Sequence, residues 1–254
     1  MHDTTRLAGR TLMITGASSG LGAHVARLAA HSGARVALVA RREGALARLA
    51  GEIGEAGGEA LALEADVANE AQMIDAFDRV EARWGPVSSV LVNAGVNRSG
   101  RAVDLSVEDL DTVFAINVRG AFIAAREAAR RMHAAGIAQE GRIVLVSSIT
   151  AQTQGSGLVA YSASKAAVSH LGRLLANEWV RSGPNVNVVS PGYFRSELAG
   201  DWFETEAGKR QLSAMPRGRL MEQEALDATL LHLLSDESRF LTGADIRIDD
   251  GQTL

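Results

Sequence analysis

The sequence contains no cysteine, which excludes disulfide bridges and thiolate metal sites. Membrane-directed segments are also missing: residues 1–10 hold no apolar run of the secretory type, and no window reaches the ~18 uninterrupted apolar residues of a membrane span. The 26 basic residues are dispersed and the net charge is −4, so nothing attracts nucleic acid or an anionic membrane in general. We therefore expect a soluble, cytoplasmic protein that binds neither nucleic acid nor membrane and holds no metal.

The length of 254 residues and a hydrophobic content of 46% suffice for one large α/β domain, and we expect a single domain over residues 1–254. Apolar runs of strand length alternate with segments of helical periodicity. The predicted strands cover residues 11–15, 35–40, 60–64, 89–93, 142–147, 185–190 and 245–248. The predicted helices cover residues 21–31, 43–56, 70–84, 107–135, 160–181 and 223–234. Because the strands are too uniformly apolar to have one wet face, the alternation predicts a parallel sheet with helices on both faces.

A glycine-rich turn follows the first predicted strand, where residues 15–22 read Thr-Gly-Ala-Ser-Ser-Gly-Leu-Gly. Glycines at this position permit a tight turn and let backbone N–H groups approach a pyrophosphate at the positive end of the next helix. The spacing of Gly16, Gly20 and Gly22 is G-x-x-x-G-x-G and differs from the G-x-G-x-x-G of many dehydrogenases. Alone, the turn also fits a plain strand-to-helix connection, so the prediction of a dinucleotide site depends on the motifs that follow.

Residues 16–20 also fit the G-x-S-x-G motif of hydrolases, in which Ser18 would be the nucleophile. Such an elbow needs earlier strands to supply an oxyanion loop, whereas Ser18 follows a single predicted strand. It also needs an acid and then a histidine downstream, but His133, His170 and His232 lie in helical segments without a loop signal. The sequence therefore favours a dinucleotide turn over a hydrolase elbow.

A second motif, Tyr161 followed four residues later by Lys165, suits proton transfer. A free tyrosine has a pKa of about 10, so its phenol needs help to exchange a proton with an alcohol or ketone near neutral pH. Residues four apart share a helix face, so an ammonium at Lys165 would lie beside the phenol and favour its ionised form. Ser148 follows the predicted strand 142–147 and would place a hydroxyl at the carboxyl edge of the sheet, where open α/β sheets bind ligands.

Taken alone, the pair also fits an amphipathic helix with an incidental tyrosine and an exposed lysine. The neighbouring residues 162–164, 166 and 167 are all serine or alanine. These small side chains leave room for a ribose and a nicotinamide against the helix. They favour a reactive Tyr161.

In their order and spacing these motifs resemble the short-chain dehydrogenase/reductase family, including its 3-oxoacyl carrier-protein reductases, over essentially the whole chain. The matching positions are Thr15 to Gly22, Asp66, Asn93-Ala94-Gly95, Asn117, Ser148, Tyr161, Lys165 and Pro191-Gly192. The resemblance implies an α/β fold class: a Rossmann-like, doubly wound, mostly parallel seven-stranded sheet with helices on both faces. It also implies a catalytic tetrad of Asn117, Ser148, Tyr161 and Lys165, in which Asn117 holds a water that links Lys165 to solvent.

The resemblance further implies which residues bind the cofactor. They are Gly16, Ser18, Ser19, Gly20, Leu21, Gly22, Arg41, Arg42, Asp66, Val67, Asn93, Ala94, Gly95, Tyr161, Lys165, Pro191, Gly192, Phe194 and Ser196. Two positions depart from the family pattern: Val92 stands where asparagine is usual, and Asp249-Asp250 stand before Gly251 where paired glycines are common. Neither is a proton-transfer group, so we expect local packing to differ and the chemistry to be kept.

The end of the second predicted strand decides between the two nicotinamide cofactors. NAD enzymes typically have an acid about 20 residues beyond the glycines, where it binds the ribose 2′-hydroxyl and repels a 2′-phosphate. Here Ala40 is followed by Arg41 and Arg42, and guanidinium groups bind phosphate strongly. NADP(H) is therefore favoured over NAD(H). The alternatives are that both arginines are solvated, with Glu43 as partner, and that Asp66 is a helix N-cap instead of an adenine contact.

Family members are commonly homotetramers, and the helix that carries Tyr161 pairs across one of their interfaces. In this chain that helix has more apolar positions than one face of a monomer core needs. They are Val168, Leu171, Leu174, Leu175 and Trp179. We expect a homotetramer.

The one long segment without a regular pattern, residues 193–220, is expected to be a mobile substrate lid. Its apolar residues, Tyr193, Phe194, Leu198, Trp202, Phe203, Leu212 and Met215, suit a bulky, mostly hydrophobic substrate. Its basic residues, Arg195, Lys209, Arg210, Arg217 and Arg219, suit either a solvated face or the phosphate of an acyl carrier. If the lid does not discriminate, the pocket is expected around Ile149, Gln154 and Leu158.

Three functions of different classes follow from these observations. The favoured one is an NADP(H)-dependent oxidoreductase that transfers hydride between nicotinamide and a ketone or secondary alcohol, with a 3-oxoacyl carrier-protein or CoA thioester as the alternative substrate. The second is a cofactor-binding regulator without chemistry, although regulators of this type generally lack the Tyr161–Lys165 pair. The third is the serine hydrolase.

Overall fold

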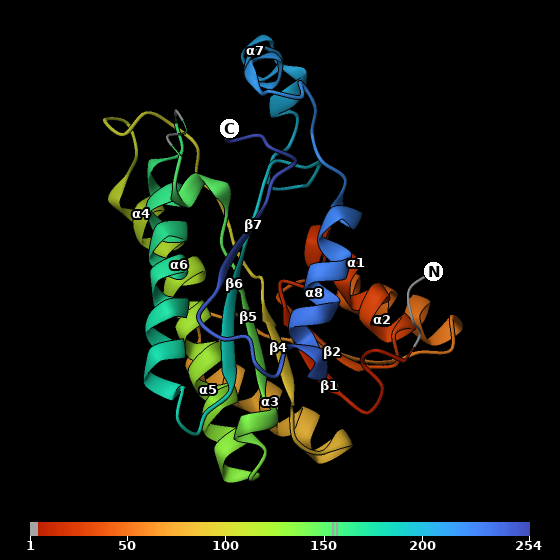
Figure 1. Cartoon of the computed structure of the whole chain (residues 1–254). Helices are drawn as coiled ribbons and strands as arrows, with labels where there is room; N and C mark the ends of the chain where they lie inside the picture. Colours follow the sequence, from red (N-terminus) through yellow and green to blue (C-terminus); the bar gives the residue numbers. More distant parts are fainter. Residues whose placement is uncertain (1–4, 154, 156) are drawn as a thin grey trace.

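The computed structural model describes residues 5–153, 155 and 157–254, so Gln154 lies outside the described residues. Seven strands form one sheet in the order β3-β2-β1-β4-β5-β6-β7, and each neighbouring pair is parallel (Figure 1). The strands are β1 Thr11–Thr15, β2 Arg35–Ala40, β3 Glu59–Glu64, β4 Ser89–Val92, β5 Arg142–Val146, β6 Asn185–Pro191 and β7 Asp245–Ile248. This is the predicted doubly wound, Rossmann-like α/β fold.

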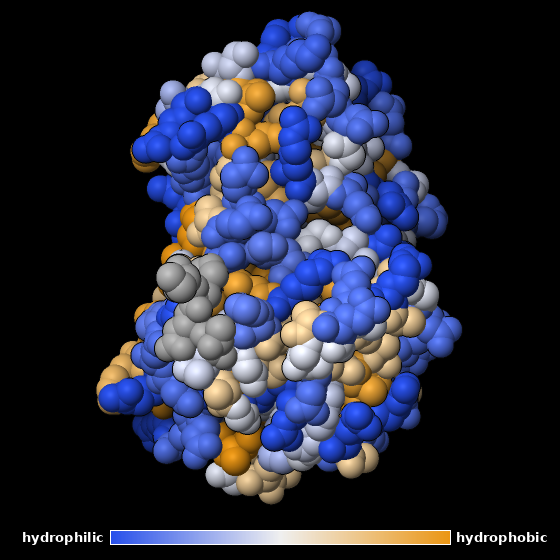
Figure 2. Space-filling model, turned by 90° about the vertical axis from the view of Figure 1, so that its right-hand side faces the viewer, coloured by the Kyte–Doolittle hydropathy of each residue, from blue (hydrophilic) through white to orange (hydrophobic). Residues whose placement is uncertain are grey.

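Helices cover both faces of the sheet. They are α1 Gly20–His31, α2 Glu43–Glu55, α3 Glu70–Trp84, α4 Val107–Phe114, α5 Gly120–Ala134, α6 Val159–Trp179, α7 Glu206–Ala214 and α8 Asp227–Leu234. One apolar core lies under α1, α2 and α8, and a second lies under α3, α5 and α6. The face with α1, α2 and α8 is mostly hydrophilic outside, with its apolar residues in small separate areas (Figure 2). Among the described residues, no helix combines the length and apolar character needed to cross a bilayer.

Two predicted segments differ from the structure. The single helix expected over residues 107–135 is interrupted by a π-helical turn, Ala115–Arg119, between α4 and α5. The stretch expected to be irregular, residues 193–220, contains the nine-residue helix α7, which Thr205 caps by accepting from the Gly208 N–H. Its apolar residues are too few and too scattered to give a helical period, which is why the pattern missed it.

The strand order places a ligand-binding edge between β1 and β4. From β1 the chain proceeds outward to β2 and β3, and then crosses to β4 on the other side of β1. In open parallel sheets ligands bind beyond the carboxyl ends of the strands at such a switch point. In Figure 1, α7 projects beyond the sheet at the end where the C-terminus lies.

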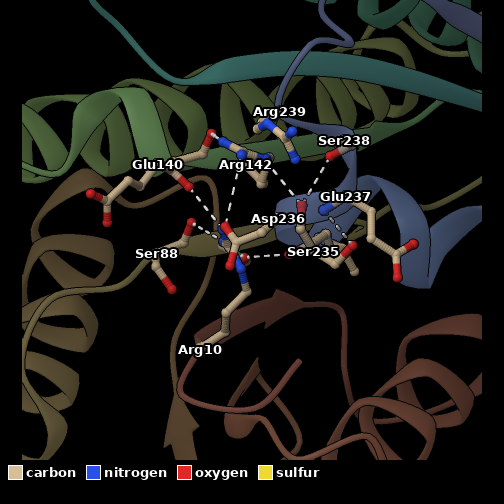
Figure 3. A network of polar contacts seen from close by, with 12 residues as sticks. Arg10, Ser88, Glu140, Arg142, Ser235, Asp236, Glu237, Ser238 and Arg239 are labelled. Atoms are coloured by element: carbon tan, nitrogen blue, oxygen red, sulfur yellow. Dashed lines mark hydrogen bonds and ion pairs between the residues drawn. The ribbon is translucent and has the colours of Figure 1, made fainter. Parts of the chain in front are cut away.

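The opposite edge is held by a polar network around two buried arginines (Figure 3). The Arg10 guanidinium donates to Ser89 Oγ at 2.6 Å, to the Glu140 carbonyl at 3.0 Å and to Asp236 at 2.5 Å. Arg142 donates to the Ser235 carbonyl at 3.1 Å. Arg10 immediately precedes β1, Ser89 is the first residue of β4, and Arg142 is the first residue of β5. The network therefore connects the starts of these three strands to the residues that follow α8. It lies far from the ligand-binding edge and leaves that edge free.

Candidate active site

Two glycines of the turn after β1, Gly16 and Gly22, leave no room for a side chain. Gly16 has φ +69° and Gly20 has φ +51°, which is the left-handed region that glycine adopts without strain. A Cβ on Gly16 would lie 2.8 Å from Ala94 Cα, and a Cβ on Gly22 would lie 2.3 Å from the Gly16 carbonyl oxygen. The glycines therefore bring the backbone of the turn close to the start of α1, which is the cradle that a pyrophosphate needs.

The residues after β4 hold this turn in place. Asn93 Nδ2 donates to the carbonyls of Thr15 at 3.1 Å and Gly16 at 3.3 Å. The Thr15 hydroxyl accepts from the N–H groups of Asn93 and Ala94 at 3.0 and 3.1 Å. Sequence reasoning included Thr15 in the motif but missed this role, because a buried threonine at a strand end carries no signal of its own.

Arg42 lies across the glycine turn. Its Nε donates to Ser18 Oγ at 3.0 Å, its Nη2 to Ser19 Oγ at 2.5 Å, and its Nη1 to the Glu197 carboxylate at 3.1 Å. Arg41 is exposed and has no hydrogen bond or ion pair with any described residue. Of the alternative in which both arginines are solvated with Glu43 as partner, the exposure of Arg41 agrees, but no ion pair with Glu43 is found among the described residues.

Asp66 follows β3 and shapes the loop that leads into α3. Its Oδ1 accepts from the Ala68 N–H at 2.9 Å, whereas Asn69 is the residue that caps α3, by accepting from Gln72 N–H at 3.2 Å. The alternative reading of Asp66 as an N-cap is therefore wrong. Its neighbour Val67 is buried, and a Cβ on Gly120 would lie 2.7 Å from it, so Val67 packs against α5.

Ser148, Tyr161 and Lys165 meet where β5 ends and α6 begins. Ser148 Oγ accepts from the Thr150 N–H at 3.1 Å and from Thr150 Oγ1 at 3.0 Å. Lys165 is 4% exposed, and its Nζ donates to the Val146 carbonyl at 2.8 Å. That Nζ lies 5.7 Å from the centre of the Tyr161 ring. The helical spacing therefore brings the phenol and the ammonium together, as the sequence predicted.

The pKa values of this pair are set by burial first. Burial raises the pKa of the Tyr161 phenol to about 12, and the hydrogen bond with Ser148 opposes that rise. Burial lowers the pKa of Lys165 to about 8. The sequence led us to expect a phenol whose ionised form is favoured, but the net shift of the Tyr161 pKa is upward, because desolvation is the largest effect. At neutral pH Tyr161 is protonated and suited to donate a proton.

Asn117 is buried and lies in the π-helical turn Ala115–Arg119. Its Oδ1 accepts from the Val96 N–H at 2.8 Å, and its Nδ2 donates to the Val96 carbonyl at 3.0 Å and to Ser164 Oγ at 2.9 Å. A Cβ on Gly95 would lie 3.4 Å from Lys165 Nζ and 3.5 Å from Asn117 Oδ1. Gly95 thus leaves space between them. Sequence reasoning missed Ser164, which also donates to the Tyr161 carbonyl at 2.7 Å.

The expected cofactor residues after β6 have structural partners. A Cβ on Gly192 would lie 2.6 Å from Gln252 Oε1 and 2.8 Å from Asp249 Cα, so the C-terminal segment requires glycine there. Phe194 forms a backbone bridge with Met221, and Ser196 Oγ accepts from the Ala199 N–H at 3.3 Å. Pro191 is the last residue of β6. Leu21, the apolar member of the cofactor residues expected in the glycine turn, is buried at the start of α1.

The segment expected to be a lid, residues 193–220, buries some of its apolar side chains. Phe203 is 7% exposed and meets the Tyr193 ring edge-on at 5.4 Å between centroids. Met215 is buried as well, whereas Trp202 is 45% exposed and donates from Nε1 to Gln211 at 2.8 Å. Phe203 therefore packs against Tyr193 within this segment, and the expectation that Phe203 faces a substrate is not supported.

Most basic side chains of the lid are paired with carboxylates. Arg195 pairs with Glu204 at 2.9 Å and Lys209 with Glu206 at 3.2 Å. Arg217 and Arg219 pair with Asp250 at 2.9 and 2.7 Å. Asp250, one of the two departures from the family pattern, has φ +49°, the left-handed conformation that a glycine would adopt freely.

The hydrolase alternative has no geometric support among the described residues. The partner of Ser18 is Arg42 and not a histidine. His232 contacts Glu237 at 3.3 Å, and a pair that the sequence did not suggest, His24 and Asp227, lies at 2.6 Å on α1 and α8.

Comparisons with known proteins agree with this geometry. The sequence model of a family described as enoyl-(acyl carrier protein) reductase matches residues 16–253. D-threitol dehydrogenase of Mycolicibacterium smegmatis is 36% identical over 98% of this chain and 95% of the relative. Galactitol 2-dehydrogenase (L-tagatose-forming) of Cereibacter sphaeroides is also 36% identical, over 98% of this chain and 97% of the relative.

Solved structures share the fold over its whole length. The crystal structure of a gluconate 5-dehydrogenase from Burkholderia cenocepacia in complex with NADP and tartrate matches with a TM-score of 0.92 at 31% identity, and the match covers 99% of this chain and 98% of that chain. Fold, motif order and full-length similarity together identify this chain as a member of the short-chain dehydrogenase/reductase family of oxidoreductases.

Proposed function

We propose that this protein is an NADP(H)-dependent oxidoreductase that interconverts a ketone and a secondary alcohol, with Tyr161 as the proton-transfer residue. The observation that carries the proposal is the meeting of the Tyr161 phenol, the Ser148 hydroxyl and the buried Lys165 ammonium at the carboxyl edge of the sheet. The retained pair argues against a regulator without chemistry. The glycine turn, Asn93 and Arg42 would hold the cofactor, which when bound supplies or accepts the hydride.

Ser148 orients the substrate oxygen. Because Thr150 donates two hydrogen bonds to Ser148 Oγ, the hydroxyl proton of Ser148 is available to another acceptor. The Tyr161 phenol hydrogen-bonds with Ser148, and the oxygen of a bound substrate would be a second acceptor. Ser148 can thus hold a carbonyl oxygen next to the phenol and stabilise negative charge on it.

Tyr161 gives its proton to the carbonyl oxygen during reduction. Its pKa of about 12 keeps the phenol protonated over the physiological range, so the donor form is always present. The tyrosinate that remains is stabilised by the Ser148 hydroxyl and by Lys165, whose Nζ has hydrogens beyond the one given to Val146. Asn117 fixes the loop at Val96 beside Lys165, and we propose that a water held there returns the proton from solvent.

The cofactor preference follows from the residues after β2. Ala40 supplies no carboxylate for a ribose 2′-hydroxyl, and the next residue, Arg41, is exposed and has no ion pair among the described residues. The 2′-phosphate of NADP(H) would interact there with the guanidinium groups of Arg41 and Arg42, whereas NAD(H) has no phosphate at that position. The relative with NADP bound, the gluconate 5-dehydrogenase, is consistent with this preference.

For the substrate we propose a small polyhydroxylated secondary alcohol or its ketone. The relatives are named for threitol, galactitol and gluconate, all polyhydroxylated molecules. Burial of Phe203 and Met215 inside the lid removes part of the argument for a bulky hydrophobic substrate. That substrate remains the second candidate, because Leu198 and Trp202 are 44% and 45% exposed. Pairing of four lid cations with carboxylates disfavours an acyl-carrier phosphate.

We also propose that the chain is a single cytoplasmic domain and forms a homotetramer. Of the residues on α6 that suggested assembly, Val168 and Leu175 are buried in the monomer core, and Leu174 alone is exposed, at 53%. Support comes instead from exposed apolar residues on the neighbouring helices. They are Val107 and Leu110 on α4 and Phe122 on α5. Light scattering at micromolar concentration tests this: a monomer would contradict it.

Turnover tests the proposed function. A panel of polyols, sugar acids, hydrophobic ketones and 3-oxoacyl thioesters is assayed with both cofactors, and kcat/KM should be highest for a polyhydroxylated substrate with NADP(H). Replacing Ala40 with Asp and Arg41 with Ser should shift the preference toward NAD(H), because the new carboxylate binds the ribose hydroxyls and repels the 2′-phosphate. A wild-type protein that already prefers NADH would contradict the cofactor proposal.

A further inference from the structure

Glu197, near the start of the lid, contacts the residues of the cofactor-binding turn. Its carboxylate pairs with Arg42 Nη1 at 3.1 Å. The hydroxyl of Ser19 hydrogen-bonds the same carboxylate and lowers the pKa of Glu197, and Arg42 adds to that effect. Three separate segments therefore meet at one anion site: the turn before α1, the residue before α2 and the start of the lid.

This anion site is the one that the proposed function assigns to a phosphate. Arg42 and Ser19 are cofactor residues by sequence, and Arg41 beside them has no partner among the described residues. A carboxylate of the chain thus occupies donors that the cofactor would use. Two anions cannot share these donors without repulsion.

We propose that Glu197 influences selectivity between the two cofactors, because its carboxylate competes with the 2′-phosphate of NADP(H) for Arg42 and Ser19. Binding of NADP(H) then releases Glu197 and the start of the lid. Binding of NAD(H), which has no 2′-phosphate, does not. The inference rests on the proposed NADP(H) preference. Glu197 acts as a built-in competitor, and it couples the identity of the cofactor to the segment that covers the substrate.

The strength of the pair suits such competition. The side chains of Arg42 and Glu197 are 52% and 64% exposed, and an ion pair at this exposure changes an equilibrium by a factor of only about two to five. A phosphate, with a charge near −2 and several acceptor oxygens, binds a guanidinium more strongly than a single carboxylate oxygen does. The pair holds the lid when no phosphate is present and gives way when one binds.

The other end of the lid is held separately. Arg217 and Arg219 bind Asp250 near the C-terminus, far along the chain from Glu197. Gly200, with φ +52°, lies between Glu197 and the lid helix and can absorb a change of backbone direction. Release of Glu197 would therefore free residues 197–200 and leave the second anchor intact.

The test uses cofactor fragments without nicotinamide, so that contacts at the catalytic residues play no part. Adenosine 2′,5′-bisphosphate and adenosine 5′-monophosphate are titrated by calorimetry into the wild type, Glu197→Gln and the control Glu204→Gln. Glu204 is matched because it is another exposed lid glutamate and pairs with Arg195, away from the turn. We expect Glu197→Gln to bind the bisphosphate about two- to fivefold more tightly than Glu204→Gln does, with the affinity for the monophosphate unchanged.

Hydrogen exchange supplies a second readout. The N–H groups of Ala199 and Gly200 are hydrogen-bonded to Ser196 and Glu197 carbonyls. In the wild type the bisphosphate should speed their exchange to the rate found in Glu197→Gln, and the monophosphate should not. Equal behaviour of Glu197→Gln and Glu204→Gln in both measurements would overturn the inference.

Arg42→Ala separates failure of this inference from failure of the proposed function. If Arg42→Ala binds the bisphosphate as well as the wild type does, the proposed NADP(H) preference is itself wrong. If Arg42→Ala weakens the bisphosphate but Glu197→Gln equals its control, the role of Glu197 alone is wrong. If the inference holds, Glu197→Gln has a smaller effect on bisphosphate affinity in an Arg42→Ala background than in the wild type, because only the competition at Ser19 remains.

Discussion

Replacement of Lys165 by methionine should change how the stability of the protein depends on pH. Burial lowers the pKa of Lys165 from 10.5 to about 8. Between these values the unfolded chain keeps a proton that the folded chain has lost, so the free energy of unfolding rises with pH. Each pKa unit corresponds to about 1.4 kcal/mol, and the shift therefore amounts to roughly 3 kcal/mol. Below pH 8 both states are protonated and the folded protein bears the full cost of a buried ammonium.

Methionine keeps an unbranched side chain of similar length and removes the titrating ammonium group. The free energy of unfolding of Lys165→Met should therefore not show this rise with pH. Urea unfolding at about pH 7.5 and about pH 10 measures it: the stability of the wild type relative to Lys165→Met should increase by roughly 2–3 kcal/mol between them. Lys209→Met, which removes an exposed lysine on α7, is the control and should run parallel to the wild type. The high pKa of Tyr161, about 12, affects stability only above pH 10. A difference that stays constant with pH would refute burial of a charged Lys165.

Three further predictions concern the turn, the C-terminal anchor and the lid. Gly22→Ala places a Cβ 2.3 Å from the Gly16 carbonyl, so NADPH affinity measured by nicotinamide fluorescence should fall at least about tenfold, and unchanged affinity would argue against the turn as the cradle. Asparagine tolerates the backbone φ of +49° at position 250, but Asp250→Asn loses the charge that pairs with Arg217 and Arg219. Amide hydrogen exchange over residues 215–220 should therefore be faster than in the wild type. Equal exchange rates would show that these ion pairs do not anchor the segment. Trp202→Ala should change kcat/KM very differently for bulky and small ketones at nearly constant NADPH affinity, and equal losses would exclude the lid as the discriminating element.

Sequence reasoning located the sheet closely, because strands buried on both faces are continuous apolar runs between turns. It located Tyr161 beside Lys165 for a similar reason, since helical spacing is fixed. It failed on the helix over residues 107–135, because a π-helical turn such as Ala115–Arg119 inserts one residue without any compositional signal. It also failed on α7, which has few core contacts to impose a period.

The partners within the site were harder to foresee than its reactive groups. Spacing indicated that an ammonium lies near the phenol, but the pKa of Tyr161 depends on how completely the fold buries it, which a local pattern does not reveal. Ser164 and Thr15 are small hydroxyl residues whose hydrogen bonds depend on segments distant in the sequence. Glu197 carried no signal, because its partner Arg42 is 155 residues away.

The central claim is that Tyr161 delivers the proton during reduction, and Tyr161→Phe tests it most directly. Phenylalanine keeps the buried ring and removes the hydroxyl, so the fold and NADPH binding should be retained. The account predicts that kcat with the best ketone of the panel falls by at least the ~10²-fold that general acid catalysis supplies, while the NADPH dissociation constant changes less than about twofold. Turnover close to that of the wild type in this variant would contradict the account.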